Sequence, residues 1–118
     1  MSRTLPKWTD EMSDGCSVPW GIRLLTSISL DGIRAVCVRH DEKYYYGGGK
    51  ADRLRADLEA ALGWLAAGMP VDEVERWYTA VRWMGAPNMK RPNVSWAFGG
   101  ARFQYDTAPA TPEEVKET

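Results

Sequence analysis

The sequence of 118 residues lacks several features that define large protein classes. Two cysteines are too few for a disulfide scaffold. A net charge of −1 shows no basic surplus, so the composition does not indicate a nucleic-acid binder. No run of about 18 apolar residues occurs, so no transmembrane helix is predicted. These absences leave one globular domain with one modest core as the expected architecture.

Catalytic and targeting signatures are also sparse. The first eight residues lack the apolar stretch of a secretory signal, so we expect none. His40 is the single histidine, and one histidine is few for a catalytic zinc site. The glycine run 47–49 lacks the Lys-Ser/Thr of a phosphate-binding loop, which argues against nucleotide binding. Any chemistry is therefore expected around His40.

Hydrophobic periodicity predicts a mainly α-helical fold with a three-helix core. Apolar residues recur at helical spacing over 30–46, 50–67 and 71–84. Glycines at 47–49 end the first of these helices and link it to the second. Gly68 ends the second helix in the same way. The three helices are therefore expected to pack in sequence order.

The segments outside the helices are predicted to be irregular. Turn-forming residues indicate a loop before the first helix. After the third helix, the aromatic residues around Trp96 and Phe98 favour an extended or hairpin-like segment. We expect a single domain over 1–105, followed by a disordered tail over 106–118 that is rich in Pro, Thr and Glu.

The only histidine lies on the apolar side of the first predicted helix. One face of that helix carries Ile33, Val36, Cys37, His40 and Tyr44. His40 is therefore expected to point toward the core. Asp41 follows about 100° further round, at the edge of the same face.

In the second predicted helix, an acidic residue interrupts an aliphatic stripe that is expected to face the core. The stripe comprises Leu54, Asp57, Leu58, Ala61, Leu62 and Leu65. A buried carboxylate without a partner is costly, so Asp57 is expected to have one. The short glycine link brings this helix back beside the first, which makes His40 the nearest candidate. The alternatives are that Asp57 pairs with a nearby arginine and that His40 is an ordinary core residue.

A histidine held by a carboxylate can act as a general base. The carboxylate binds one ring nitrogen and fixes the tautomer, so the other nitrogen can take a proton from water. Asp41, together with a loop that contains Asp14 and Gly15, would supply the hard oxygen ligands that Ca²⁺ prefers. A metal there would polarise a carbonyl and stabilise the oxyanion that forms. These residues indicate ester hydrolysis by activated water.

The His-Asp-x-x-Tyr motif at 40–44, with an aspartate on the next helix, resembles the phospholipase A2 superfamily. The resemblance implies a three-helix core of the phospholipase A2 fold. It implies that His40 activates water, that Asp57 orients the histidine and that Tyr44 belongs to the catalytic set. It also implies calcium as the cofactor, bound by Asp41.

The resemblance extends to the cysteines. In phospholipases A2 a cysteine of the calcium loop is bridged to a cysteine one turn before the catalytic histidine. Cys16 and Cys37 occupy similar positions in this sequence. A disulfide between them and two free thiols are both open.

A more specific resemblance covers roughly 13–85. It is to a family of small phage and prophage proteins of unassigned function. They share an Asp-Gly-x-Ser-x-Pro loop, here 14–19, and a His-Asp-x-x-Tyr-x-x-Gly-Gly motif, here 40–48. This resemblance implies a phage protein that resides in the virion or the host cytoplasm.

Two functions of different classes follow. The first is a phage-encoded, phospholipase A2-like ester hydrolase that acts on bacterial envelope lipid, with calcium as the candidate cofactor. The second is a non-catalytic phage structural or accessory protein, such as a virion, tail or assembly component. Six tryptophans, five tyrosines and an acidic tail suit the second function, because such features often serve partner surfaces. The expected partners are a phospholipid surface in the first case and other phage structural proteins in the second, with no nucleic acid in either.

Overall fold

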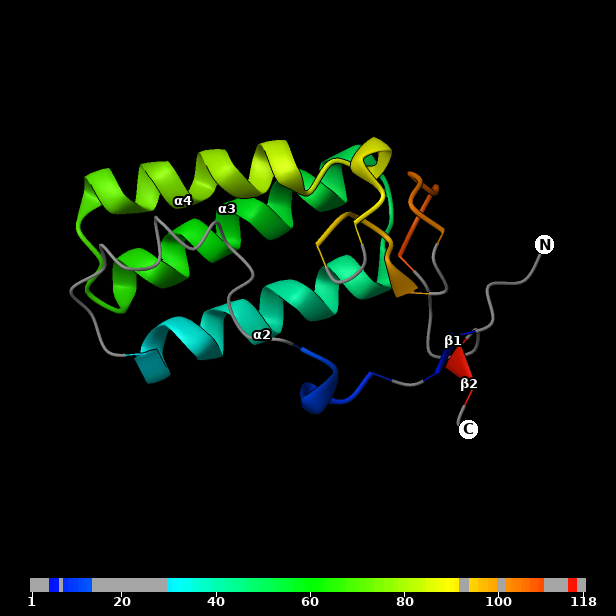
Figure 1. The fold of residues 1–118 in the computed structure, drawn as a ribbon, viewed down its shortest axis with the longest axis horizontal. Helices are drawn as coiled ribbons and strands as arrows, with labels where there is room; N and C mark the ends of the chain where they lie inside the picture. Colours follow the sequence, from blue (N-terminus) through cyan, green and yellow to red (C-terminus); the bar gives the residue numbers. More distant parts are fainter. Residues whose placement is uncertain are drawn as a thin grey trace.

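The computed structural model describes residues 5–6, 8–13, 30–91, 94–99, 102–109 and 115–116. Its helices confirm the mainly α-helical prediction, with a three-helix core (Figure 1). The predicted boundaries agree with the observed ones, except that the second helix ends one residue earlier. In chain order the elements are β1 (Leu5–Pro6), η1 (Asp10–Met12), α2 (Leu30–Tyr46), α3 (Lys50–Ala66), α4 (Val71–Met84), η2 (Pro87–Met89) and β2 (Val115–Lys116).

Glycines shape the turn that places α3 beside α2. Gly47 and Gly48 have φ values of 81° and 131°, a region that residues with a Cβ rarely adopt. The Asp52 carboxylate accepts a hydrogen bond from the backbone N–H of Gly49 at 2.8 Å, which satisfies a free donor at the start of α3. The chain therefore reverses over three residues, and α3 returns antiparallel to α2 (Figure 1).

α3 packs against both α2 and α4, and the main core lies where the three helices meet. Trp64 of α3 and Trp77 of α4 are buried there with their rings 5.1 Å apart, edge to face. Such aromatic pairs add to the free energy gained by burial. The core residues are Ile33, Cys37, Ala60, Trp64, Met69, Val74 and Trp77. The predicted inward face of α2 is confirmed, because Ile33, Cys37, His40 and Tyr44 are all buried.

The leucine stripe predicted to be the buried face of α3 is instead exposed. Leu54, Leu58, Leu62 and Leu65 have exposed fractions of 40%, 45%, 65% and 45%. The buried face of α3 consists of Arg53, Ala56, Asp57, Ala60 and Trp64. Small residues allow close packing on α2: a Cβ added at Gly63 would lie 3.0 Å from a Val36 methyl group. Close helix approach and burial of a large indole therefore outweigh burial of the leucines.

The segment after α4 closes one end of the helical core. Trp96 is buried against Tyr44, and its indole N–H donates to the Gly48 carbonyl at 2.9 Å. The extended or hairpin-like arrangement expected here does not occur among the described residues, since 94–99 form turns with Ala97 at a φ of 58°. The backbone N–H of Asp106 also donates to Gly48, at 2.8 Å, so the packed part of the chain includes the first residue of the expected tail.

The N-terminal residues also contact the helices. Trp8 is buried, and its ring lies 5.4 Å from that of Tyr45. Leu5 and Val115 are partners in the two-residue parallel pairing of β1 with β2 (Figure 1). Among the described residues, no helix has both the length and the apolarity needed to cross a membrane.

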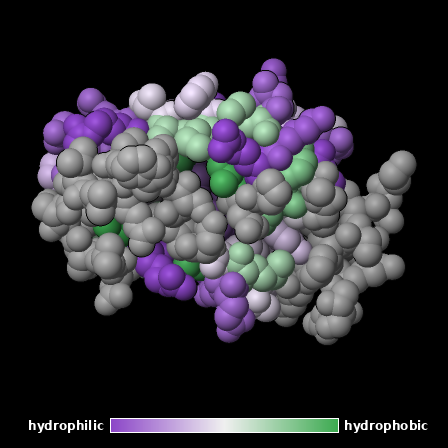
Figure 2. Space-filling model, viewed as in Figure 1, coloured by the Kyte–Doolittle hydropathy of each residue, from purple (hydrophilic) through white to green (hydrophobic). Residues whose placement is uncertain are grey.

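The outer side of α4 carries both polar and apolar residues, and Val71 and Trp83 are its large exposed hydrophobic residues. Figure 2 shows hydrophilic residues toward both ends of the upper edge, along which α4 runs in Figure 1, with hydrophobic residues between them. Trp83 is 71% exposed, so it is not a core residue, unlike Trp64 and Trp77.

Candidate functional site

The predicted His40–Asp57 pair is present in the structure. The glycine turn sets α2 and α3 antiparallel, and the middle of each helix carries one member of the pair. His40 Nε2 lies 2.7 Å from Asp57 Oδ1. Asp57 is fully buried, and His40 is 9% exposed. This geometry suits a histidine whose Nε2–H donates to the carboxylate, which leaves Nδ1 as the basic nitrogen.

Asp57 is the centre of a larger hydrogen-bond network. The Tyr44 hydroxyl donates to Oδ1 at 2.6 Å, and Arg82 of α4 donates to Oδ2 at 2.6 Å. Burial by itself raises the pKa of the Asp57 carboxyl, but its interactions with His40, Tyr44 and Arg82 outweigh burial and hold the pKa below its usual value. Asp57 is therefore ionised at neutral pH and fixed from three sides. Asp57 therefore binds both kinds of partner that the sequence offered as alternatives, a histidine and an arginine.

Tyr44 links this pair to a second arginine. Burial, followed by the neighbouring Asp57 charge, raises the pKa of the Tyr44 phenol well above its usual value, so the hydroxyl stays protonated. Arg53 Nε donates to the Tyr44 oxygen at 3.1 Å, and Arg53 also donates to the hydroxyl of Tyr105 and the carbonyl of Val81. Tyr44 thus holds Asp57 in place.

Sequence reasoning did not identify Arg53 or Arg82 as members of the site. The one available signal for Arg53 is its i, i+4 spacing to Asp57 on α3. For Arg82 the signal is weaker still, because it lies 25 residues away on another helix. Its contact depends on how α4 packs on α3, which the local pattern does not specify.

His40 lines a cleft of about 790 Å³ along the seam between α2 and α3. This volume is in the range of small-molecule sites. Small apolar residues, including Ala56, Ala60 and Gly63, line part of the cleft. Among the described residues, none hydrogen-bonds to His40 Nδ1. A nearly buried histidine with one ring nitrogen occupied, beside a small-molecule-sized cleft, can exchange a proton with a molecule in that cleft.

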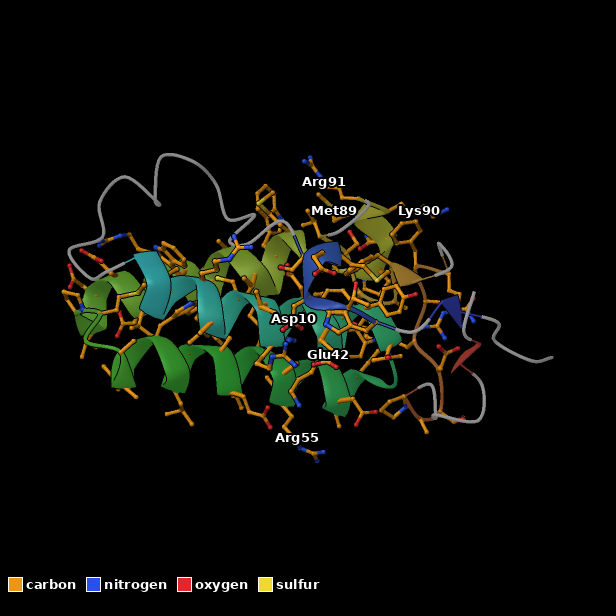
Figure 3. The ribbon with its side chains drawn as sticks, turned by 90° about the horizontal axis from the view of Figure 1, so that it is seen from below. Asp10, Glu42, Arg55, Met89, Lys90 and Arg91 are labelled. Atoms are coloured by element: carbon orange, nitrogen blue, oxygen red, sulfur yellow. The ribbon has the colours of Figure 1, made fainter. Side chains whose placement is uncertain are left out.

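Charged residues border the cleft. Lys43 of α2 and Glu59 of α3 form an ion pair across it, with Nζ and Oε2 3.2 Å apart. Arg39 pairs with both Glu42 and Asp10, and the last two lie close together in Figure 3. A polar rim around a partly apolar cleft suits a ligand that has both an apolar and a polar part.

The expected calcium ligands are described only in part. Asp41 is 8% exposed, and its Oδ2 accepts a hydrogen bond from the Ser13 hydroxyl at 2.6 Å. Asp14 and Gly15 lie outside the described residues. Within the described part of the chain, no group of three or more His, Cys, Asp or Glu side chains could hold a metal. The carboxylate of Asp41 is the type of hard oxygen donor that calcium takes, and the remaining ligands would have to come from other groups.

The sequence leaves open whether the cysteines are bridged or free, and the structure answers this for Cys37. Cys37, one turn before His40 on α2, is disulfide-bonded. Cys16 lies outside the described residues. Cys37 is also part of the main core, so the bond is attached near the middle of α2, on its packed side.

Gly85 provides a test of how closely the network is packed. A Cβ at Gly85 would lie 2.6 Å from the Tyr44 hydroxyl and 2.5 Å from the Val81 carbonyl oxygen. We expect Gly85→Ala to lower the free energy of unfolding by about 1–3 kcal/mol, because these overlaps force both the Tyr44 side chain and the Val81 carbonyl to move. Urea denaturation measures the change.

Gly63→Ala is the matched control for that substitution. Its added methyl group meets only Val36 side-chain atoms, and alanine favours a helix interior over glycine by about 1 kcal/mol. We expect the free energy of unfolding to change little, because this gain offsets the cost of shifting the Val36 side chain, whose methyl carbon would lie 3.0 Å from the new Cβ. Equal effects of the two substitutions would show that the Tyr44 hydroxyl and the Val81 carbonyl both tolerate displacement.

We compared the chain with protein-family models, curated proteins and solved structures, and none of them matches it.

Proposed function

We propose that this protein is a phage-encoded, phospholipase A2-like ester hydrolase that acts on lipid of the bacterial envelope. The observation that carries the proposal is the His40–Asp57 pair, 2.7 Å apart and beside a cleft that His40 lines. A structural histidine can have the same buried partner. The adjoining cleft of about 790 Å³ is what favours a chemical role.

The residues present suit hydrolysis by activated water. His40 Nδ1 takes a proton from a water molecule, and the water oxygen attacks the ester carbonyl carbon. Asp57 accepts the Nε2–H bond and stabilises the imidazolium that forms. When the tetrahedral intermediate collapses, the bond to the alcohol oxygen breaks and His40 returns its proton to that oxygen. The products are a carboxylic acid and an alcohol, and no covalent enzyme intermediate forms.

Calcium is part of the proposal through Asp41, with Asp14 and Gly15 as the other expected ligands. When bound, the ion would supply positive charge for the carbonyl oxygen as it becomes negative. Asp41 follows His40 directly in the sequence, so its carboxylate is held by the same helix that positions the base.

The test is release of fatty acid from phospholipid vesicles with calcium and with a chelator. We expect the chelator to reduce the rate at least about 100-fold, because a bound metal contributes several kcal/mol of transition-state stabilisation. Asp41→Asn should cause a similar loss. Asp72→Asn, which alters an exposed aspartate on α4, should not. If the chelator and Asp41→Asn leave the rate unchanged, calcium plays no part in the reaction.

A further inference from the structure

The outward face of α3 carries an unusual apolar stripe. Leu54, Leu58, Leu62 and Leu65 are 40–65% exposed. Their spacing of four, four and three residues places them within about 80° of the helix circumference. Single exposed leucines are normal on protein surfaces, but four in one line form a contiguous patch of the kind that marks an interaction site.

The described part of the chain does not cover this leucine stripe. None of the three hydrophobic clusters formed by the described residues includes any of these leucines. α2 and α4 both pack against α3. The residues of α3 that are buried include Ala56, Ala60 and Trp64, which lie on the side of the helix away from the leucine stripe. Within the described residues, the stripe therefore lies on the side of α3 that faces away from α2 and α4.

The charges beside the stripe indicate what kind of partner fits. Arg55 and Glu59 border it on one side, with side chains 69% and 49% exposed. Figure 3 shows Arg55 pointing away from the helical body. Within the chain, Arg55 Nη1 lies 3.9 Å from Asp52 Oδ1 and Glu59 Oε2 lies 3.2 Å from Lys43 Nζ, but both side chains stay largely exposed. One positive and one negative charge, one turn apart, therefore suit a surface that carries the same two charges in reverse order. An anionic lipid surface would instead favour positive charges alone.

We propose that two copies of this protein associate through the leucine stripe, with their α3 helices antiparallel about a two-fold axis near Leu58. Leu58 then meets Leu58 of the second copy, and Leu54 lies opposite Leu62. In this register Arg55 and Glu59 of the second copy are offset by only two residues, about 3 Å along the helix axis. The stripe thus matches itself in both apolar contact and charge, as a two-fold interface requires.

The size of the surface agrees with such a dimer. Stable interfaces bury about 800 Å² per partner, with an apolar centre and a polar rim. The four leucines expose a few hundred Å² of apolar surface, which is enough for the centre. The proposal does not rest on catalysis, because none of the four leucines lines the cleft beside His40, although Arg55 and Glu59 lie at its edge.

The experiment is sedimentation equilibrium on the full chain and on Leu58→Gln/Leu62→Gln. We expect the wild-type protein to be a dimer. In the double variant the dimer dissociation constant should rise at least about 100-fold, because both copies carry each substitution and every one removes a buried leucine from the interface. Trp83→Gln is the matched control. It removes a side chain that is 71% exposed on α4, and the dimer should persist. Leu58 and Leu62 are exposed, so the double variant should keep its fold, which circular dichroism checks.

A charge exchange distinguishes the proposed register from other associations. Arg55→Glu should weaken the dimer, and Arg55→Glu/Glu59→Arg should restore it, because the opposite charges meet again. A wild-type protein that is monomeric at about 100 µM would overturn the proposal. So would a dimer that the leucine substitutions leave intact. A monomer that binds anionic vesicles only when Leu58 and Leu62 are present would assign the stripe to lipid instead.

Discussion

Asp57→Ala is expected to lower the free energy of unfolding by about 3 kcal/mol, a large part of the 5–15 kcal/mol that holds a typical domain together. The substitution leaves His40 Nε2, the Tyr44 hydroxyl and the Arg82 guanidinium without their shared acceptor. Removing one partner of a buried ion pair costs about 3–5 kcal/mol. We expect the lower end of this range, because Arg82 is 32% exposed and can turn toward water.

Two further variants separate this effect from a general loss of charge. Asp72→Ala removes an exposed aspartate that pairs with Arg76 at 3.4 Å on α4, and it should cost less than 1 kcal/mol. Asp57→Asn keeps the shape of the side chain, so its cost should lie between those of the two alanine variants. Urea denaturation at pH 7 measures all three. A loss below 1 kcal/mol for Asp57→Ala would mean that the network contributes little to the fold.

The helices could be predicted because each shows a local signal. Glycines at 47–49 and at 68 stop α2 and α3, and the apolar spacing from Ile33 to Tyr44 fixes which side of α2 is buried. Because only three residues connect the two helices, α3 must run back alongside α2. The His40–Asp57 pair follows from these two facts, so it could be inferred before the structure was known.

The rotation of α3 about its own axis could not be predicted. Hydrophobicity favours burial of the leucines, but the structure buries small residues and Trp64. Asp57 lies on the buried face in either case, so the sequence predicts the pair correctly even though the leucine stripe that it predicts to be buried is exposed. Packing between helices, which depends on residue size as well as polarity, decides this rotation. The same packing brings Arg82 to Asp57.

His40→Gln is expected to reduce hydrolysis of phospholipid by about 10²–10⁴-fold, the usual contribution of a general base. The fold should be retained, because a glutamine amide can still donate to Asp57, so the free energy of unfolding should change by less than about 1 kcal/mol. Asp57→Asn should also reduce the rate, since an amide no longer stabilises the imidazolium or fixes its tautomer. Fatty-acid release and urea denaturation, measured on the same preparations, separate loss of chemistry from loss of structure.

The outcome of this substitution decides between the two functional classes. If the His40→Gln protein hydrolyses lipid as fast as the wild type, any activity comes from elsewhere and His40 is a structural residue that satisfies Asp57. A protein that is abundant in phage particles, and particles that stay infectious with His40→Gln, would then favour the non-catalytic structural role. A loss of hydrolysis with an unchanged free energy of unfolding would not be explained by a purely structural role of His40. Asp57 would keep its other two donors, Tyr44 and Arg82, so what disappears is the imidazole of His40, a residue that lines the cleft.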